Sequence, residues 1–282
     1  MDRLIVAVDA RRQALVDVIS HAHREITLSL FRCNDGVIFD ELAAATARGV
    51  AVDVLVTSRS KGRPRGRQKL WAALDRTGAT LHAYSDPVVK YHAKYLVADD
   101  GPAVVASLNF TRKCFSRTCD AIVVTSDPDV VSGLRRLMAA DRDRLPIPAD
   151  LPPRLIVGPE RARRQFTSII EQARTSIRLI DAKLSDPDLI ALLRAKRAAG
   201  VTVEIVSAPR VAGLKSHGKL MLIDDRVLVV GSTALSAMSL DFRREVSIVV
   251  EDPAALAEAA RLFASIVTER PEPPASSDLV IW

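Results

Sequence analysis

Two stretches of the chain share one layout of residues suited to phosphate chemistry. Tyr91–Asn109 reads YHAKYLVADDGPAVVASLN, and Ser216–Ala234 reads SHGKLMLIDDRVLVVGSTA. Each contains H-x-K, then four residues and an Asp, then six residues and a small residue followed by Ser. Two His/Lys pairs at matching spacing are difficult to attribute to chance. Together they can attack a phosphodiester and protonate it from opposite sides.

The aliphatic and β-branched residues of each motif predict a strand, in which residues two apart point to one face. His92 would then project with Lys94, and His217 with Lys219. Histidine serves both as a nitrogen nucleophile and as a proton shuttle, because its ordinary pKa of about 6.5 lies close to neutral pH. Lysine supplies a donor for the charge on the non-bridging phosphate oxygens.

The acidic turns at Asp99 and Asp224 predict that each motif is a hairpin. The returning strands would bring Ser107 and Asn109 beside the first His/Lys face, and Ser232 beside the second. These side chains are further candidates for phosphate binding.

A histidine that transfers protons also needs a group that fixes its tautomer. Asp120 and Glu245 each follow a short way after one of the hairpins. They are the candidate orienting carboxylates, and the alternative for each is an ordinary solvated or salt-bridged carboxylate.

The motifs belong to a chain that repeats one plan. Arg3–Val6 and Arg154–Val157 both read RLIV, and RRQ recurs at 11–13 and 163–165 before an amphipathic helical pattern. Strand, helix and strand patterns follow in both copies at a spacing of 151 residues, apart from a one-residue slip in the first helix. The repeat predicts an α/β fold made of two halves.

The Pro-rich segment 145–153 (LPIPADLPP) cannot continue a helix and is the predicted boundary. We therefore predict a first half at residues 1–148, a second half at 149–270 and a flexible tail at 271–282. The first half also carries the basic segment Arg59–Lys69 (RSKGRPRGRQK). This segment is either a solvated loop or a rim that gathers a polyanion.

Composition narrows the functional class. The net charge is +6 with a pI near 9.5, which favours an anionic partner, either nucleic acid or an acidic membrane surface. No apolar run is long enough to span a membrane, and the N-terminus does not have the pattern of a secretory signal, so we predict a cytoplasmic protein with peripheral membrane contact as an option. Cys114 and Cys119 have no nearby His or Cys to complete a metal site.

The paired H-x-K-x4-D motifs and the repeat around them resemble the phospholipase D superfamily over nearly the whole chain. The resemblance implies two tandem phospholipase D-like α-β-α sandwich halves, related by a pseudo-twofold axis, with one shared active site. It implies a phosphohistidine intermediate, a second histidine that acts first as acid and then as base, and no metal or other cofactor. It also implies that Asp99 and Asp224 are structural, and that Asp120 and Glu245 orient the histidines.

Two positions depart from the family pattern. Ala106 stands where the first motif usually has Gly, and Ala234 stands where the second usually has Asn. The second change removes a donor, and losing such a donor can cost about 2.7–4 kcal/mol where it contacts the transition state.

The leading functional prediction is a phosphodiesterase or phosphatidyltransferase that acts on phospholipid. The first alternative is a metal-independent nuclease, favoured by the basic charge, although the basic segment lacks the aromatic residues that stack on single strands. The second alternative is a non-catalytic phosphate-binding module, indicated only by Ala234.

Overall fold

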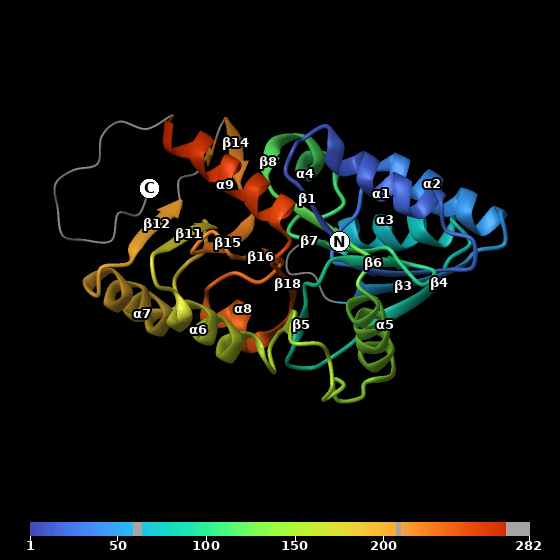
Figure 1. Ribbon diagram of the computed structural model, residues 1–282. Helices are drawn as coiled ribbons and strands as arrows, with labels where there is room; N and C mark the ends of the chain where they lie inside the picture. The colour runs from blue at the N-terminus through green and yellow to red at the C-terminus, as the bar shows by residue number, and fades with distance from the viewer. Residues whose placement is uncertain (59–63, 207–209, 212, 269–282) are drawn as a thin grey trace.

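The computed structural model describes residues 1–58, 64–206, 210–211 and 213–268. Two large β-sheets lie side by side, each with helices against it (Figure 1). The tail predicted at 271–282 lies outside the described residues, as do residues 59–63 of the basic segment. The predicted α/β class with two successive halves is confirmed.

Most helices have an equivalent in the other half. The helices are α1 (Ala10–Ser20), α2 (Gly36–Ala47), α3 (Pro64–Asp75), α4 (Arg112–Arg117), α5 (Pro128–Asp143), α6 (Ala162–Gln172), α7 (Pro187–Ala198), α8 (Ala237–Phe242) and α9 (Pro253–Thr268). The strands of the first half are β1 (Asp2–Ile5), β2 (Glu25–Leu30), β3 (Ala51–Thr57), β4 (Thr80–Tyr84), β5 (Lys90–Tyr91), β6 (Tyr95–Ala98), β7 (Ala103–Ala106), β8 (Thr118–Cys119) and β9 (Ile122–Thr125). Those of the second half are β10 (Leu155–Val157), β11 (Ser176–Asp181), β12 (Thr202–Val206), β13 (Arg210–Val211), β14 (Leu214–Ser216), β15 (Lys219–Ile223), β16 (Val227–Gly231), β17 (Arg243–Arg244) and β18 (Val246–Val250).

The two large sheets repeat one topology. The first has the order β1-β9-β7-β6-β2-β3-β4, and the second has the order β10-β18-β16-β15-β11-β12. In both sheets the strand at the start of the half pairs antiparallel with the last strand, and the two strands joined by the second helix pair in parallel. The first half adds α3 and β4. The sheets use residues 2–125 and 155–250, and the boundary at 148/149 stays a prediction.

An ion pair explains why arginine recurs at the start of both halves. Arg12 contacts Asp35 at 2.8 Å, and Arg163 contacts Asp186 at 2.7 Å. Both aspartates precede the second helix of their half, so the arginine ties the first helix to the start of the second. These two arginines are 151 residues apart, which is the spacing of the rest of the repeat. The structure therefore keeps one spacing, although the RRQ triplets themselves are offset by one residue.

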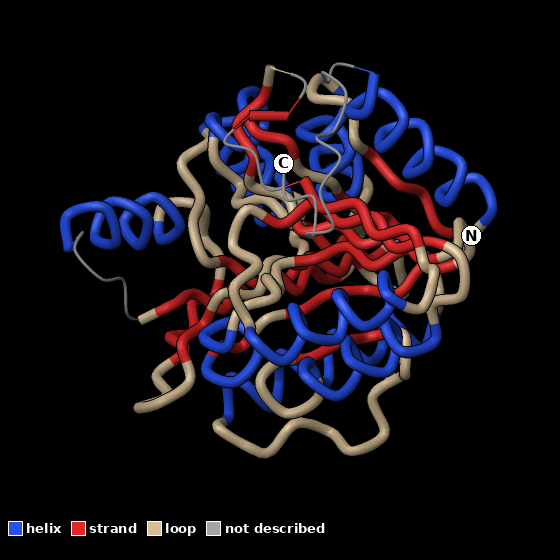
Figure 2. The backbone as a smooth tube through the Cα atoms, turned by 90° about the vertical axis from the view of Figure 1, so that its left-hand side faces the viewer, coloured by secondary structure: helices blue, strands red, loops and turns tan. Residues whose placement is uncertain are grey.

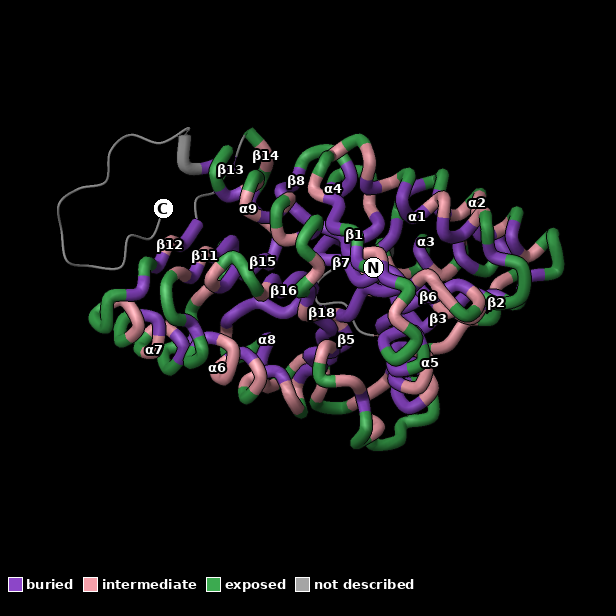
Figure 3. The backbone as a smooth tube through the Cα atoms, in the orientation of Figure 1, coloured by how far each residue is buried: buried purple, intermediate pink, exposed green. Residues whose placement is uncertain are grey.

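The core extends across both halves. One buried cluster packs α1 and α2 on the first sheet, and a second packs α6 and α7 on the other sheet. The third cluster joins the inner faces of both sheets to α5 and α9, with Val97, Leu134, Leu222 and Phe263 among its members. Strands accordingly form the inner layers between helices (Figure 2), and their residues are mostly buried (Figure 3).

The predicted hairpins are present, but the H-x-K residues do not lie within continuous strands. Strands β6 and β7 form the first hairpin, and β15 and β16 form the second. However, His92 and Lys94 lie in a break between β5 and β6, and His217 lies in a break between β14 and β15. The strand prediction is wrong at these positions because the flanking strands belong to different sheets.

Asp99 and Asp224 fasten the hairpin turns to the start of a neighbouring strand. The Asp99 carboxylate accepts bonds from the backbone amides of residues 23–25 at 2.8–3.0 Å. The Asp224 carboxylate accepts bonds from the amides of residues 174–176 at 2.7–2.8 Å and from the Thr175 hydroxyl at 2.9 Å. Both aspartates adopt a positive φ.

The described helices include none that is both long enough and apolar enough to cross a membrane.

We expect Asp224→Asn to lower the free energy of unfolding by about 1 kcal/mol, because a partly exposed carboxylate loses charge-assisted bonds that solvent already screens. Burial raises the pKa of Asp224, but the backbone amides outweigh this effect and lower it to about 2. The contribution of the carboxylate is therefore present above its ordinary pKa of 3.8 and is lost as the pH falls toward 2. Urea unfolding at pH 7 and at pH 2 measures both effects. Asp225→Asn, at the exposed neighbour, is the control; an equal loss in both variants would contradict this role.

Candidate active site

Two short strand pairs connect the halves and determine where the histidines lie. Strand β5 runs parallel to β17 of the other half, and β14 runs parallel to β8. The ladders continue past the strands, since the His92 amide donates to the Arg244 carbonyl at 2.9 Å and the Gly218 amide donates to the Cys119 carbonyl at 2.7 Å. Each H-x-K segment is thereby held against the carboxylate-bearing segment of the opposite half.

Gly218 is required by this close approach. A Cβ atom at this position would lie 2.6 Å from the Cys119 carbonyl oxygen and 3.3 Å from the Asp120 Cα atom. The equivalent residue of the first motif is Ala93, which is fully buried. The sequence pattern did not predict a role for this glycine, because the middle residue of H-x-K is variable.

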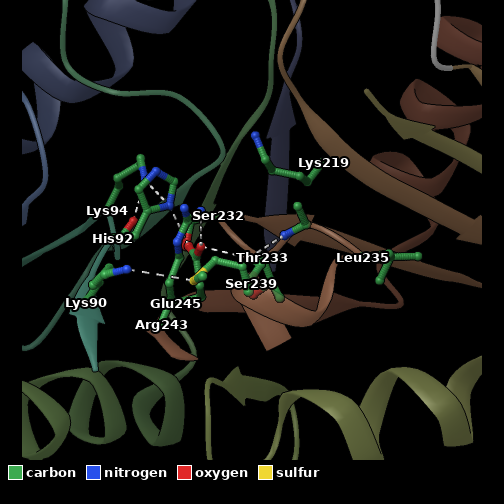
Figure 4. A network of polar contacts seen from close by, with 12 residues as sticks. Lys90, His92, Lys94, Lys219, Ser232, Thr233, Leu235, Ser239, Arg243 and Glu245 are labelled. Carbon is green, nitrogen blue, oxygen red and sulfur yellow. Dashed lines mark hydrogen bonds and ion pairs between the residues drawn. The ribbon is translucent and has the colours of Figure 1, made fainter. Parts of the chain in front are cut away.

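Both predicted carboxylates contact a histidine, and each contact crosses between the halves. His92 Nδ1 lies 2.7 Å from Glu245 Oε2 (Figure 4). His217 Nδ1 lies 3.0 Å from both carboxylate oxygens of Asp120. Asp120 and Glu245 are fully buried, whereas the side chains of His92 and His217 keep 12% and 25% of their surface exposed. Each histidine is thus held at Nδ1 while part of its ring remains accessible.

Both motif lysines are buried beside their histidines. The Nζ atoms of Lys94 and Lys219 donate to the carbonyl oxygens of His92 and His217, two residues earlier in the chain. Lys94 Nζ also lies 3.1 Å from His92 Nδ1. Two buried ammonium groups next to two imidazoles form a site that favours an anion.

Neighbouring hydroxyls hold the carboxylates in place. Ser107 Oγ donates to Asp120 at 2.7 Å, and Thr118 Oγ1 donates to it at 2.6 Å. Ser239 Oγ donates to Glu245 at 2.8 Å (Figure 4). Ser107 is thus engaged by a carboxylate, although its predicted role included phosphate binding.

Ser232 occupies the position equivalent to Ser107. Its Oγ accepts a bond from the Val246 amide at 3.0 Å and donates to the Val246 carbonyl at 3.2 Å, next to Glu245. Thr118 and Ser239 were not predicted. The 125-residue spacing that relates His92 to His217 also relates Cys114 to Ser239, so the repeat itself marks the Ser239 position.

Comparison with known proteins identifies the family of the chain. Residues 15–142 and 209–267 match the family described as "Cardiolipin synthase, PLD-like domain". The chain belongs to this phospholipase D-like family. No curated protein sequence gives a significant match.

Two solved structures share the phospholipase D-like fold at low sequence identity. Polyphosphate kinase from Porphyromonas gingivalis superposes with a TM-score of 0.76 at 22% identity, covering 93% of this chain and 46% of that protein. The chain thus spans less than half of that kinase. Phosphatidylserine synthase from Haemophilus influenzae Rd KW20 superposes with a TM-score of 0.71 at 12% identity, covering 94% of this chain and 86% of that protein.

The first His/carboxylate pair of this phospholipase D-like site has a defined charge state. Burial lowers the pKa of His92 to about 3 and outweighs the opposite effect of Glu245. Burial alone would raise the pKa of Glu245, but His92 and Lys94 lower it to about 2. A neutral imidazole therefore faces an ionised carboxylate. The Nδ1 atom carries the proton toward Glu245, and Nε2 keeps its lone pair.

Burial and neighbouring charges also shift the pKa values of other groups in the site. Burial, together with Lys219, lowers the pKa of Lys94 to about 7, against the opposite effect of Glu245. Burial lowers the pKa of Lys183 too, and the positive charges of Lys219 and Arg243 add to this effect. For Asp120, burial would raise the pKa, but His217 and Lys219 lower it.

The predicted donor Asn109 is buried directly after the first hairpin. Its Oδ1 atom has no hydrogen-bond partner within the described part of the chain, so no other residue there holds the amide through this atom. Ala234, equally buried, occupies the matching position of the second half. The two halves therefore provide unequal donor sets.

Cys114 has candidate metal-ligating neighbours in the folded chain, although its neighbours in the sequence supply none. One ligand atom from each of Cys114, Asp120 and His217 lies within 4.8 Å of the other two. Sequence neighbours could not reveal this cluster, because His217 comes from the other half. Its groups are already engaged, since Ser107, Thr118 and His217 all bond to Asp120, and the positive charge of Lys219 opposes a cation. The donor set therefore fits a proton-transfer pair better than a metal centre.

We expect ¹⁵N NMR of the His92 ring to show the neutral Nδ1–H form from pH 5 to pH 9, because its pKa is about 3. The unfolded chain binds a proton near the ordinary pKa of 6.5, so the free energy of unfolding should decrease as the pH falls from about 6.5 toward 3. His23, which is exposed, is the internal reference. Titration of His92 near pH 6.5 would contradict this assignment.

Proposed function

We propose that the protein is a metal-independent phosphodiesterase or phosphatidyltransferase that forms a phosphohistidine intermediate and acts on phospholipid. The observation that carries this proposal is the pair of histidines held at Nδ1 by Glu245 and Asp120, with two buried lysines beside them. One such histidine is a common structural feature. Two, joined across the halves, provide both a nucleophile and a proton donor.

His92 is the proposed nucleophile. Its pKa of about 3 leaves the imidazole unprotonated at neutral pH, so Nε2 has a lone pair available for attack and no proton to give. Its Nδ1 proton points to Glu245, which stabilises the positive charge that the ring gains when Nε2 bonds to phosphorus. His217, with the more exposed ring, is then the proton donor.

The proposed reaction has two balanced steps. In the first step, Nε2 of His92 forms a bond to phosphorus, the bond from phosphorus to the leaving oxygen breaks, and His217 gives its Nε2 proton to that oxygen. In the second step, His217 takes a proton from water or from an acceptor alcohol, whose oxygen attacks phosphorus and displaces His92. Both residues return to their starting protonation states.

The lysines provide the charge that a metal ion supplies in many phosphoryl-transfer enzymes. Lys94 and Lys219 are each at most 7% exposed, so their ammonium groups act in a site with little water. Asn109 offers a further donor on the first-half side. Ala234 offers none, which makes the proposed stabilisation of the phosphate oxygens one-sided.

Phospholipid is the proposed substrate because the matched family is described by a cardiolipin synthase and one structure with this fold is a phosphatidylserine synthase. The net charge of +6 supports peripheral contact with an anionic membrane surface on the cytoplasmic side. A nuclease would use the same two histidines, and a binding module would hold phosphate at the same site without turnover. The substrate panel below distinguishes these three functions.

We expect His92→Ala and His217→Ala each to lower the release of head group from phospholipid by about 10²–10⁴-fold, with EDTA present throughout. His23→Ala, which removes an exposed histidine, is the matched control. The panel contains anionic and choline phospholipids, bis(4-nitrophenyl) phosphate and DNA. Turnover of DNA alone would replace lipid by nucleic acid as the substrate, and turnover of no substrate would contradict an enzyme.

Quenched reactions of His217→Ala with bis(4-nitrophenyl) phosphate should accumulate phosphorus bound to His92, because 4-nitrophenolate leaves without needing the acid whereas the second step lacks its base. Mass spectrometry of acid-labile phosphohistidine peptides measures this intermediate. Phosphorus found on His217 in a reacting His92→Ala variant would contradict the proposed roles.

We expect kcat/KM to fall as the pH rises through about 7, because Lys94 loses the proton with which it binds phosphate. A phosphodiester keeps one negative charge in this range, so the fall in kcat/KM above pH 7 reports the titration of a group on the enzyme. Lys94→Arg should move the fall in kcat/KM to higher pH, since guanidinium stays protonated, although the rate decreases with the changed geometry. If kcat/KM of this variant falls at the same pH as that of the wild type, another group is responsible for the titration.

A further inference from the structure

A cavity of about 370 Å³ lies in the first half, between α3 and the ends of β2 and β3. Its walls combine positive and apolar side chains, and none of the described lining residues is acidic. The cationic members are Arg32, Arg67 and Lys69, and the largest apolar members are Phe31, Phe39 and Leu70. This size accommodates a small ligand or one arm of a larger one.

One aromatic ring links this cavity to the candidate active site. The Phe31 ring, which lines the cavity, lies with its centroid 4.5 Å from that of the His92 ring and 5.3 Å from Lys94 Nζ. The Arg32 guanidinium lies 4.9 Å from the same ring centroid. A group bound in the cavity would therefore be separated from the reacting phosphate by about the thickness of one side chain.

The second half has no equivalent of this arrangement among its described elements. Helix α3, which provides Arg67 and Lys69, belongs to the insertion of the first half. At the 151-residue spacing, Ala182 takes the place of Phe31. The cavity therefore distinguishes one side of the candidate active site from the other.

We propose that this cavity binds a second phosphate, carried by the alcohol arm that leaves from or attacks the reacting phosphate. This inference rests on the proposed function and specifies its substrate class as a diester with a further phosphoryl group on one arm. Three cations, with no acidic side chain among the described lining residues, match a dianion, and the two guanidinium groups can bond phosphate oxygens in pairs. The apolar walls accept the carbon skeleton between the two phosphates.

The cavity also suggests a role for the C-terminal end of the basic segment Arg59–Lys69 noted in the sequence. Of the described residues of Arg59–Lys69, Arg67 and Lys69 line the cavity, and Arg67 is fixed by donation to the Ser58 carbonyl at 2.5 Å. An apolar acyl chain would offer these cations no anionic partner and would cover part of their surface, which is unfavourable. The charge of the wall therefore favours a phosphorylated polar arm over an acyl chain.

The test compares two soluble lipids that differ by one phosphate, dihexanoyl phosphatidylinositol and its 4-phosphate. The wild-type protein should cleave the 4-phosphate with a higher kcat/KM, by about tenfold and mainly through KM. Lys69→Met and Arg32→Met should abolish this preference while leaving turnover of bis(4-nitrophenyl) phosphate within about threefold. Arg164→Met, which removes an exposed arginine from α6, is the control. An equal preference in all variants would overturn the proposal.

Calorimetric titration with inorganic pyrophosphate decides the proposal independently of turnover. Binding should weaken about tenfold in Lys69→Met and remain unchanged in Arg164→Met, and equal binding in both would overturn the cavity assignment. If no diester is cleaved but Lys69→Met weakens pyrophosphate binding, the proposed function fails and the phosphate site stands. A further comparison uses the dinucleotides TpT and pTpT, which also differ by one phosphate. If the protein prefers pTpT in a Lys69-dependent way and shows no preference for the lipid 4-phosphate, the second phosphate belongs to a nucleotide.

Discussion

Each motif histidine takes its carboxylate from the other half of the chain, and the arrangement of the candidate site depends on this exchange. The parallel pairs β5–β17 and β14–β8 bring the backbone of each H-x-K segment alongside the opposite acidic segment. Glu245 and Asp120 then reach His92 and His217 at 2.7 and 3.0 Å. Neither half alone supplies both the histidine and the carboxylate of either motif pair. The shared core around α5 and α9 keeps the halves in the position that the exchange requires.

The contacts between the halves also offset the unfavourable burial of the charged side chains. Lys94, Lys219, Asp120 and Glu245 are nearly or fully inaccessible to water, and isolated ions in such surroundings are very unfavourable. Here each carboxylate has a histidine, a hydroxyl and a lysine nearby, and each lysine also bonds to a backbone carbonyl. The network contains two positive and two negative groups around two neutral or proton-carrying rings. It can therefore receive a negatively charged phosphate without rearranging its own bonds.

Sequence alone predicted the two halves, both His/Lys pairs and both carboxylates, because these features repeat at fixed spacing. It could not show that His92 bonds to Glu245 instead of a residue of its own half, since spacing within a half carries no information about contacts between halves. The breaks at His92 and His217 were missed for a related reason. Their aliphatic neighbours favour strands, but the strands before and after each histidine pair with different partners. Ser239 was overlooked because its counterpart in the first half, Cys114, carries a thiol in place of a hydroxyl.

The halves repeat in backbone but differ in chemistry at corresponding places. Phe31 corresponds to Ala182, and Asn109 corresponds to Ala234. A phosphodiester has two ester oxygens that are alike at phosphorus and differ only in what they carry. In a site with identical halves, the diester would bind equally well in either direction, and either bond would break. Under the proposed function, the bulky ring and the donor on one side and the methyl groups on the other would make the two oxygens distinguishable. The small differences that weaken the repeat would thereby fix the direction in which the proposed substrate binds.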